Sequence, residues 1–421
     1  MIVFVIIVYI LLALCVLHSK NKRHFTECFK MWLISFGCYG LVLFISHLYI
    51  NNPETDYFIN IDQLDFFQKA KDLASIKGFN YHDVFDEFIY SEAPLIYYLF
   101  ALLYKLGIWL GIGDILLFMK LNVVFLASFV PPLIYKIFTA LNIQRNNSNK
   151  KILIFCFLAP FTLLSCQLMR DIHVLVLYTL SFYLCINSNI RHRIIYLLFL
   201  SIILVFIRLE SGLFSLVFPL VALWGNYRAT KYRFIKLGIP LVIVIGLSFA
   251  VPFIINTMTS SITGYSEHSL EAASGGSLGA LVARFPIPIN YFCLAAFSQI
   301  LPFPIWWPLE HDPQPYCWLV LWDSIFPFYW IAVWLMIFLN IRKMFANIPS
   351  SLLLLLLASI LFIILCSIGE FNVRRIMAVY PIIFVACSYL KNNNILSTKY
   401  HYSIMSTVGL VFLHIIYLII K

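Results

Sequence analysis

Eight carboxylates gather between residues 56 and 98, out of 19 acids in a chain of 421 residues, and the runs on either side are apolar. A carboxylate beside a bilayer is costly unless something solvates it, so we expect this stretch to carry chemistry. Asp62, Phe66 and Lys69 fall on one face of a helix, which makes Asp62 our first candidate for a general base. Asp65 could take the same role. The alternative is a solvated helix start with a polar face.

A second group of candidates begins the next helix. Glu92 stands two residues before Pro94, and Tyr97 follows one turn later. Proline presets the backbone of a first helical turn, and a glutamate there suits the helix dipole, which is a sufficient structural explanation. The alternative is that Glu92 and Tyr97 line a pocket for an acceptor.

Arginines and acids also interrupt apolar runs at three later points. Guanidinium groups match phosphate oxygens geometrically, so these points predict a phosphate site. The alternative is that the charges pair with one another and only anchor helix ends. The residues concerned are Arg170, Asp171, Arg208, Glu210, Arg374 and Arg375, with Arg284 as a further candidate in a later loop.

Composition places the chain in a membrane. It is 62% hydrophobic and 11% charged, where a soluble domain is about a quarter charged. The net charge of +10 comes largely from short loops between apolar runs, which is typical of topology signals, so we expect no nucleic-acid partner. The 10 cysteines include no CxxC pair and no metal-type spacing with histidine.

The predicted fold is all-α and polytopic, a single transmembrane domain over 1–421 with about 12 spans. The apolar segment 93–110 is ambiguous, and we place it as a helix lying on the outer surface. The predicted spans are 1–17, 32–50, 115–139, 152–169, 172–187, 194–208, 211–225, 237–256, 317–340, 351–369, 376–390 and 403–420.

Charge supports this placement. If 93–110 does not cross, six loops fall on one side and carry 17 of the 29 basic residues, with Glu27 as their one acid. The positive-inside rule then makes these loops cytoplasmic. It follows that 51–114 is an outer loop with surface helices, and that 257–316 is a large outer loop.

These residues resemble the polyprenyl-phosphate-dependent membrane glycosyltransferases of the GT-C class, such as protein O-mannosyltransferases and aminoarabinose transferases. That family shows D-E-x-x-Y-x-x-x-A in its first outer loop, and this chain has D-Q-x-x-F-x-x-x-A from Asp62 to Ala70. The family's P-P-L-Y-Y corresponds to A-P-L-I-Y-Y here. An outer Arg-Asp follows, and Arg374 and Arg375 precede Tyr380-Pro381 as in bacterial relatives. Gln63 replaces the family's glutamate, so the paired-carboxylate metal site is not expected, although a divalent cation stays open as a cofactor.

The resemblance implies a GT-C-like glycosyltransferase in the bacterial inner membrane. It would transfer a sugar or oligosaccharide from a polyprenyl phosphate or pyrophosphate to a saccharide or lipid acceptor at the outer face, in the assembly of surface polysaccharide or glycoconjugate. The chain also looks like the Wzy-type polymerases of O-antigen and capsule repeat units, which share the donor class and the compartment. A lipid-linked oligosaccharide flippase or another transporter is the alternative of a different class.

Overall fold

A computed structural model describes residues 1–19, 21–49, 61–75, 94–143, 148–225, 285–286, 289–306, 309, 316–369, 373–393 and 400–420. Throughout these residues the regular secondary structure is helical, with no strand. Glu92, Arg284, the predicted span 237–256 and most of the predicted outer loop 257–316 lie outside the described residues.

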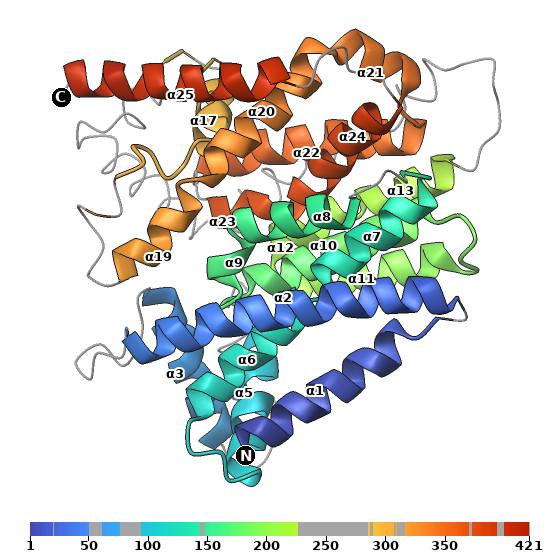
Figure 1. The fold of residues 1–421 in the computed structure, drawn as a ribbon. Coiled ribbons are helices and arrows are strands. Elements are labelled where there is room, and N and C mark those ends of the chain that lie inside the picture. The colour runs from blue at the N-terminus through green and yellow to red at the C-terminus, as the bar shows by residue number, and fades with distance from the viewer. Residues whose placement is uncertain are drawn as a thin grey trace.

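The first half of the chain forms the lower and central part of the molecule in Figure 1. Its helices are α1 (Ile2–Leu17), α2 (Lys22–Tyr49), α3 (Ile61–Ser75), α5 (Pro94–Trp109), α6 (Ile115–Ala127), α7 (Val130–Ala140), α8 (Ser148–Leu158), α9 (Phe161–Leu164), α10 (Asp171–Ile186), α11 (Arg193–Ile207), α12 (Leu209–Ser215) and α13 (Val217–Gly225).

The second half lies on the opposite side and ends in a long helix at the edge (Figure 1). Its elements are α17 (Ile289–Ser298), α19 (Tyr316–Asp323), α20 (Phe326–Leu339), α21 (Ile341–Asn347), α22 (Ser350–Gly369), α23 (Val373–Ile376), the 3-10 turn η1 (Met377–Val379), α24 (Tyr380–Asn392) and α25 (Tyr400–Ile420).

The chain is an all-α membrane protein, but the predicted count of about 12 full-length spans is not met. In the part of the chain that the structure describes, six helices are long and apolar enough to cross a membrane, and six further apolar helices have 10 to 17 residues. The long ones are Lys22–Leu48, Ile115–Ala140, Val320–Leu339, Ser350–Ser367, Val373–Asn392 and His401–Ile419.

Two physical reasons account for the difference. The predicted span 152–169 is broken into α8 and α9, because Pro160 has no N–H with which to continue the helical hydrogen bonds. Helices of 15 or 16 residues, such as α10 and α11, reach only about 24 Å, whereas the hydrocarbon core is about 30 Å thick. The predicted helix in the segment 93–110 is present as α5 (Pro94–Trp109).

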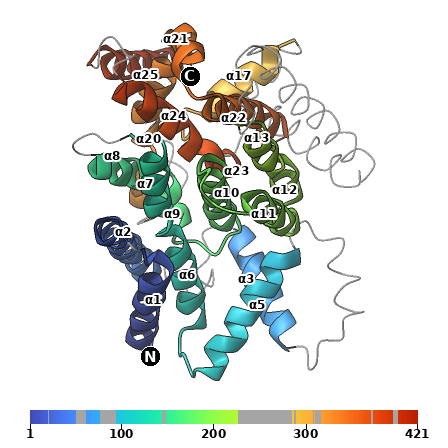
Figure 2. The ribbon, with the colours of Figure 1, turned by 90° about the vertical axis from the view of Figure 1, so that its right-hand side faces the viewer.

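The helix α10 occupies the centre of the bundle. It packs against α6, α7, α11, α13 and η1, and Figure 2 shows it between α7 and α9 on one side and α11 and α12 on the other. Its residues Tyr178 and Phe182 are fully buried. By contrast, α1 and α25 lie at opposite edges and expose large apolar side chains such as Phe4 and Phe412. This distribution suits a bundle whose outer helices face lipid.

Candidate functional site

The helix α3 is held in place by one face, which leaves its acids on the other. Gln63, Phe66, Ala70 and Leu73 are buried and follow the three- and four-residue spacing of a helix stripe. The ring of Phe66 packs on Tyr97 of α5, with ring centroids 5.0 Å apart. In both ribbon views α3 and α5 lie side by side (Figures 1 and 2).

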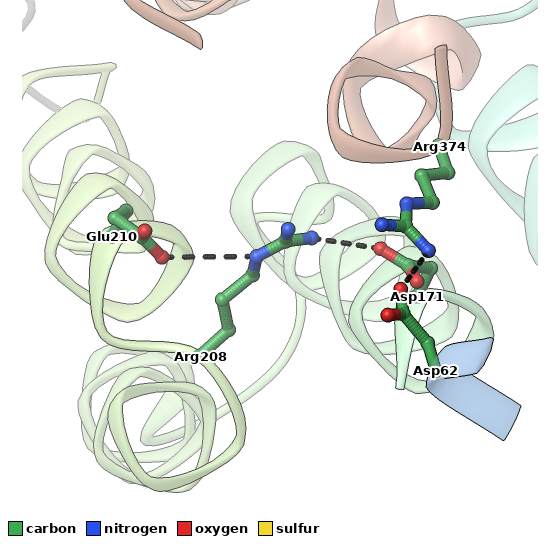
Figure 3. A network of polar contacts seen from close by, with 5 residues as sticks. All are labelled: Asp62, Asp171, Arg208, Glu210 and Arg374. Atoms are coloured by element: carbon green, nitrogen blue, oxygen red, sulfur yellow. Dashed lines mark hydrogen bonds and ion pairs between the residues drawn. The ribbon is translucent and has the colours of Figure 1, made fainter. Parts of the chain in front are cut away.

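Asp62 lies in the first turn of α3 and forms an ion pair with Arg374 of α23. The two residues are 312 positions apart in the sequence. Figure 3 shows the two side chains pointing toward one another from different helices. The Asp62 side chain is 46% exposed and that of Arg374 18%, so solvent or a ligand can reach the pair. The structure therefore joins one predicted base to one predicted phosphate ligand.

Gln63 has a structural role that the sequence did not reveal. Its side chain is 1% exposed, and its Oε1 accepts a hydrogen bond from the backbone N–H of Leu168 at 3.2 Å. This contact ties the start of α3 to the segment before α10. The spacing of Gln63 with Phe66 and Ala70 was the available signal, because it places Gln63 on the buried stripe.

Asp65, the alternative base, is engaged differently. Its Oδ2 accepts a hydrogen bond from the Tyr97 hydroxyl at 3.0 Å and lies 3.0 Å from Nζ of Lys69. The Lys69 ammonium also lies over the Tyr97 ring, 5.0 Å from its centroid. Asp65 and Tyr97 thus form a brace between α3 and α5. The proposed partner of Tyr97 in an acceptor pocket, Glu92, lies outside the described residues.

A second charged group lies inside the bundle. Arg208 bridges α11 and α12 in an extended conformation, and its guanidinium contacts Asp171 at 2.7 Å and Glu210 at 3.7 Å (Figure 3). The side chains of Arg208 and Asp171 are only 6% and 5% exposed. The buried guanidinium is therefore matched by two carboxylates, of which Asp171 is at hydrogen-bond distance.

Neighbouring contacts fix this second group. The Tyr178 hydroxyl of α10 donates a hydrogen bond to the carbonyl of Ser211 at 2.7 Å, which ties α10 to α12. The short helix α23, which carries Arg374 and Arg375, packs against α22.

Arg170 and Arg375 flank the paired charges. Arg170 immediately precedes α10 and is half-buried, and the adjacent Asp171 turns to Arg208. Arg375 is half-buried on the same short helix as Arg374. Four guanidinium groups and three carboxylates are thus distributed over the ends of α3, α10, α11, α12 and α23.

The close crossing of α11 and α12 gives a testable prediction. A Cβ atom added at Gly212 would lie 2.2 Å from the backbone nitrogen of Val205, which no side-chain movement can relieve. We expect Gly212→Ala to separate the helices and lower the melting temperature of the detergent-solubilised protein, since overpacking costs about 1–3 kcal/mol. Gly409→Ala is the control, because a Cβ there meets nothing within 4 Å. Equal melting temperatures for the two variants would contradict this.

No cluster of three or more His, Cys, Asp or Glu side chains able to hold a metal ion occurs in the described ranges. Comparison with family models, curated proteins and solved structures finds no match to this chain.

Proposed function

We propose that this protein is a membrane glycosyltransferase of GT-C-like architecture that uses a polyprenyl-linked sugar donor at the outer face of the bacterial inner membrane. The observation that carries the proposal is the accessible Asp62 carboxylate beside the Arg374 guanidinium, at the end of an apolar helical bundle. An acceptor base and a donor-phosphate ligand have to be neighbours in such a reaction.

The reaction assigns a role to each group. The acceptor hydroxyl oxygen forms a bond to the anomeric carbon of the donor sugar, while the bond from that carbon to the phosphate oxygen breaks. Asp62 takes the hydroxyl proton, and the electron pair of the broken bond stays on the polyprenyl phosphate. Arg374 and Arg375, with Arg170, stabilise the charge that develops on the leaving phosphate, which is the usual electrostatic contribution to such catalysis.

The buried pair of Arg208 and Asp171 supports a different role for Arg208 from the one that the sequence suggested. The charge of Arg208 is already matched by Asp171 and Glu210, and the Arg208 side chain is 6% exposed. We therefore assign Arg208 to the architecture that holds α10, α11 and α12 together. The donor contact is assigned to the arginines at the more accessible positions.

Polymerisation of repeat units is a variant of the same chemistry. Transport of the lipid-linked saccharide is the second candidate function. Transport is favoured by one specific observation, the helix interruption between α8 and α9. Discontinuous helices are typical of transporter binding sites. A flippase would move the lipid-linked saccharide without cleaving it.

The proposal can be tested in a strain of the source cell from which the gene for this protein has been deleted. Loss of the transferase should leave the polyprenyl-linked donor unconsumed, so it accumulates and can be extracted and identified by mass spectrometry. Purified protein in proteoliposomes should then convert this lipid, with an acceptor, into polyprenyl phosphate or pyrophosphate. An intact donor that only changes leaflet would establish transport instead. Consumption that yields lengthened chains of repeat units would establish polymerisation.

The predicted orientation can be checked independently. Cysteines placed at Ser148 and at Ser261, which lies outside the described residues, should react with a membrane-impermeant thiol reagent from opposite sides. The physical reason is the concentration of basic residues in the loops next to Ser148. Labelling is measured in intact cells and in inverted vesicles, with wild-type protein as the background for the native cysteines. Labelling of both sites from one side would overturn the topology.

A further inference from the structure

The ion pair between Asp62 and Arg374 joins two groups that the proposed reaction needs for different substrates. We propose that the phosphate of the polyprenyl donor displaces Asp62 from Arg374, so that the carboxylate becomes available to the acceptor only after the donor has bound. The protein would then bind its substrates in a fixed order, donor first. This inference rests on the proposed function, and it adds that donor binding determines when Asp62 can act as the base.

The contact blocks the base in a direct way. The Nη1 atom of Arg374 is hydrogen-bonded to Oδ2 of Asp62, so that oxygen is occupied by a donor group. An acceptor hydroxyl needs an oxygen of the carboxylate within about 2.6–3.2 Å to pass its proton. As long as Arg374 holds Asp62, Oδ2 is shared with the guanidinium, and the carboxylate is oriented toward Arg374 instead of toward an acceptor hydroxyl.

The structure identifies the partner that moves. Asp62 has a short side chain on a helix anchored by the Gln63 contact to Leu168 and by the buried Phe66. Arg374 has a long, flexible side chain on the four-residue helix α23. Rotation of the arginine side chain can therefore carry the guanidinium from the carboxylate to a phosphate while α3 stays in place.

The ion pair between Asp62 and Arg374 is weak enough for a phosphate to replace Asp62. The pair is only partly buried, so breaking it costs less than breaking a fully buried pair, and a phosphate offers several oxygens that a guanidinium binds in a bidentate manner. The pair of Arg208 and Asp171 is the internal contrast. Its members are 6% and 5% exposed, so an incoming phosphate cannot reach it in the same way.

Binding of undecaprenyl phosphate to the purified full-length protein in nanodiscs tests the inference. Because Asp62 competes with the phosphate for Arg374 and repels it, Asp62→Asn should tighten binding about three- to tenfold. Arg374→Ala should weaken it about ten- to a hundredfold, the loss typical of a charge-assisted contact. Asp72→Asn, an exposed acid on the same helix, is the matched control and should bind like wild type.

The outcomes separate the two proposals. If Arg374→Ala weakens binding but Asp62→Asn does not tighten it, the displacement is wrong and the phosphate site stands. If undecaprenyl phosphate binds no better than undecaprenol, or Arg374→Ala has no effect, the phosphate site and the displacement both fail. A double variant, Asp62→Asn with Arg374→Ala, should bind as weakly as Arg374→Ala alone. Asp62→Ser repeats the test should the asparagine variant fail to fold.

Discussion

Asp62→Asn is expected to abolish sugar transfer while the protein keeps its normal level in the membrane. Loss of a general base costs about 10²–10⁴ in rate, because the acceptor hydroxyl must then lose its proton to water. The Asp62 side chain is 46% exposed, and asparagine keeps its size and can still accept a hydrogen bond from Arg374, so folding should be unaffected. Turnover of the extracted lipid donor, normalised to the amount of protein, is the measurement.

The Asp65→Asn variant shows which of the two carboxylates is the base. Asp65 ties α3 to Tyr97 of α5 and pairs with Lys69 on its own helix, so Asp65→Asn should retain most of the activity. If Asp65→Asn abolishes transfer and Asp62→Asn does not, the base is Asp65. If both variants work normally, the carboxylates of α3 have no catalytic role. The same Asp62 variant should bind the carrier phosphate more tightly, a combination that simple damage to the site would not produce.

Asp171→Ala is expected to cause the largest loss of stability. It leaves the buried Arg208 without its nearest carboxylate, and breaking a buried ion pair from one side costs about 3–5 kcal/mol. A lower yield and a lower melting temperature of the solubilised protein would be observed. Lys69→Ala is the control, because it breaks the exposed pair with Asp65 and should cost no more than about 1 kcal/mol.

A double replacement distinguishes an architectural role for Arg208 from a ligand-binding one. Asp171→Leu combined with Arg208→Met removes both charges and fills the space with apolar groups, which is often neutral or stabilising. We expect this variant to recover the melting temperature and to turn over donor at a rate close to wild type. Recovered stability with lost turnover would instead place Arg208 at the donor phosphate.

The sequence by itself determined the class of the protein and the location of most of its helices. In the parts that the structure describes, each predicted span coincides with one helix or with consecutive helical segments. Hydropathy and helical spacing are local properties of the chain, so they can be read without knowledge of the fold. Among the described residues the number of full-length spans was overpredicted, although Pro160 was a visible signal that 152–169 is interrupted.

Only the tertiary structure decided which charges meet. Asp62 pairs with Arg374 across 312 positions, and Asp171 turns away from its neighbour Arg170 toward Arg208. Such partners depend on how helices pack, because side chains distant in sequence become neighbours only when their helices cross. The same holds for Gln63, whose contact with Leu168 sets the position of α3. Residue types and spacing therefore nominate the groups that can do chemistry, while packing selects which of them act together.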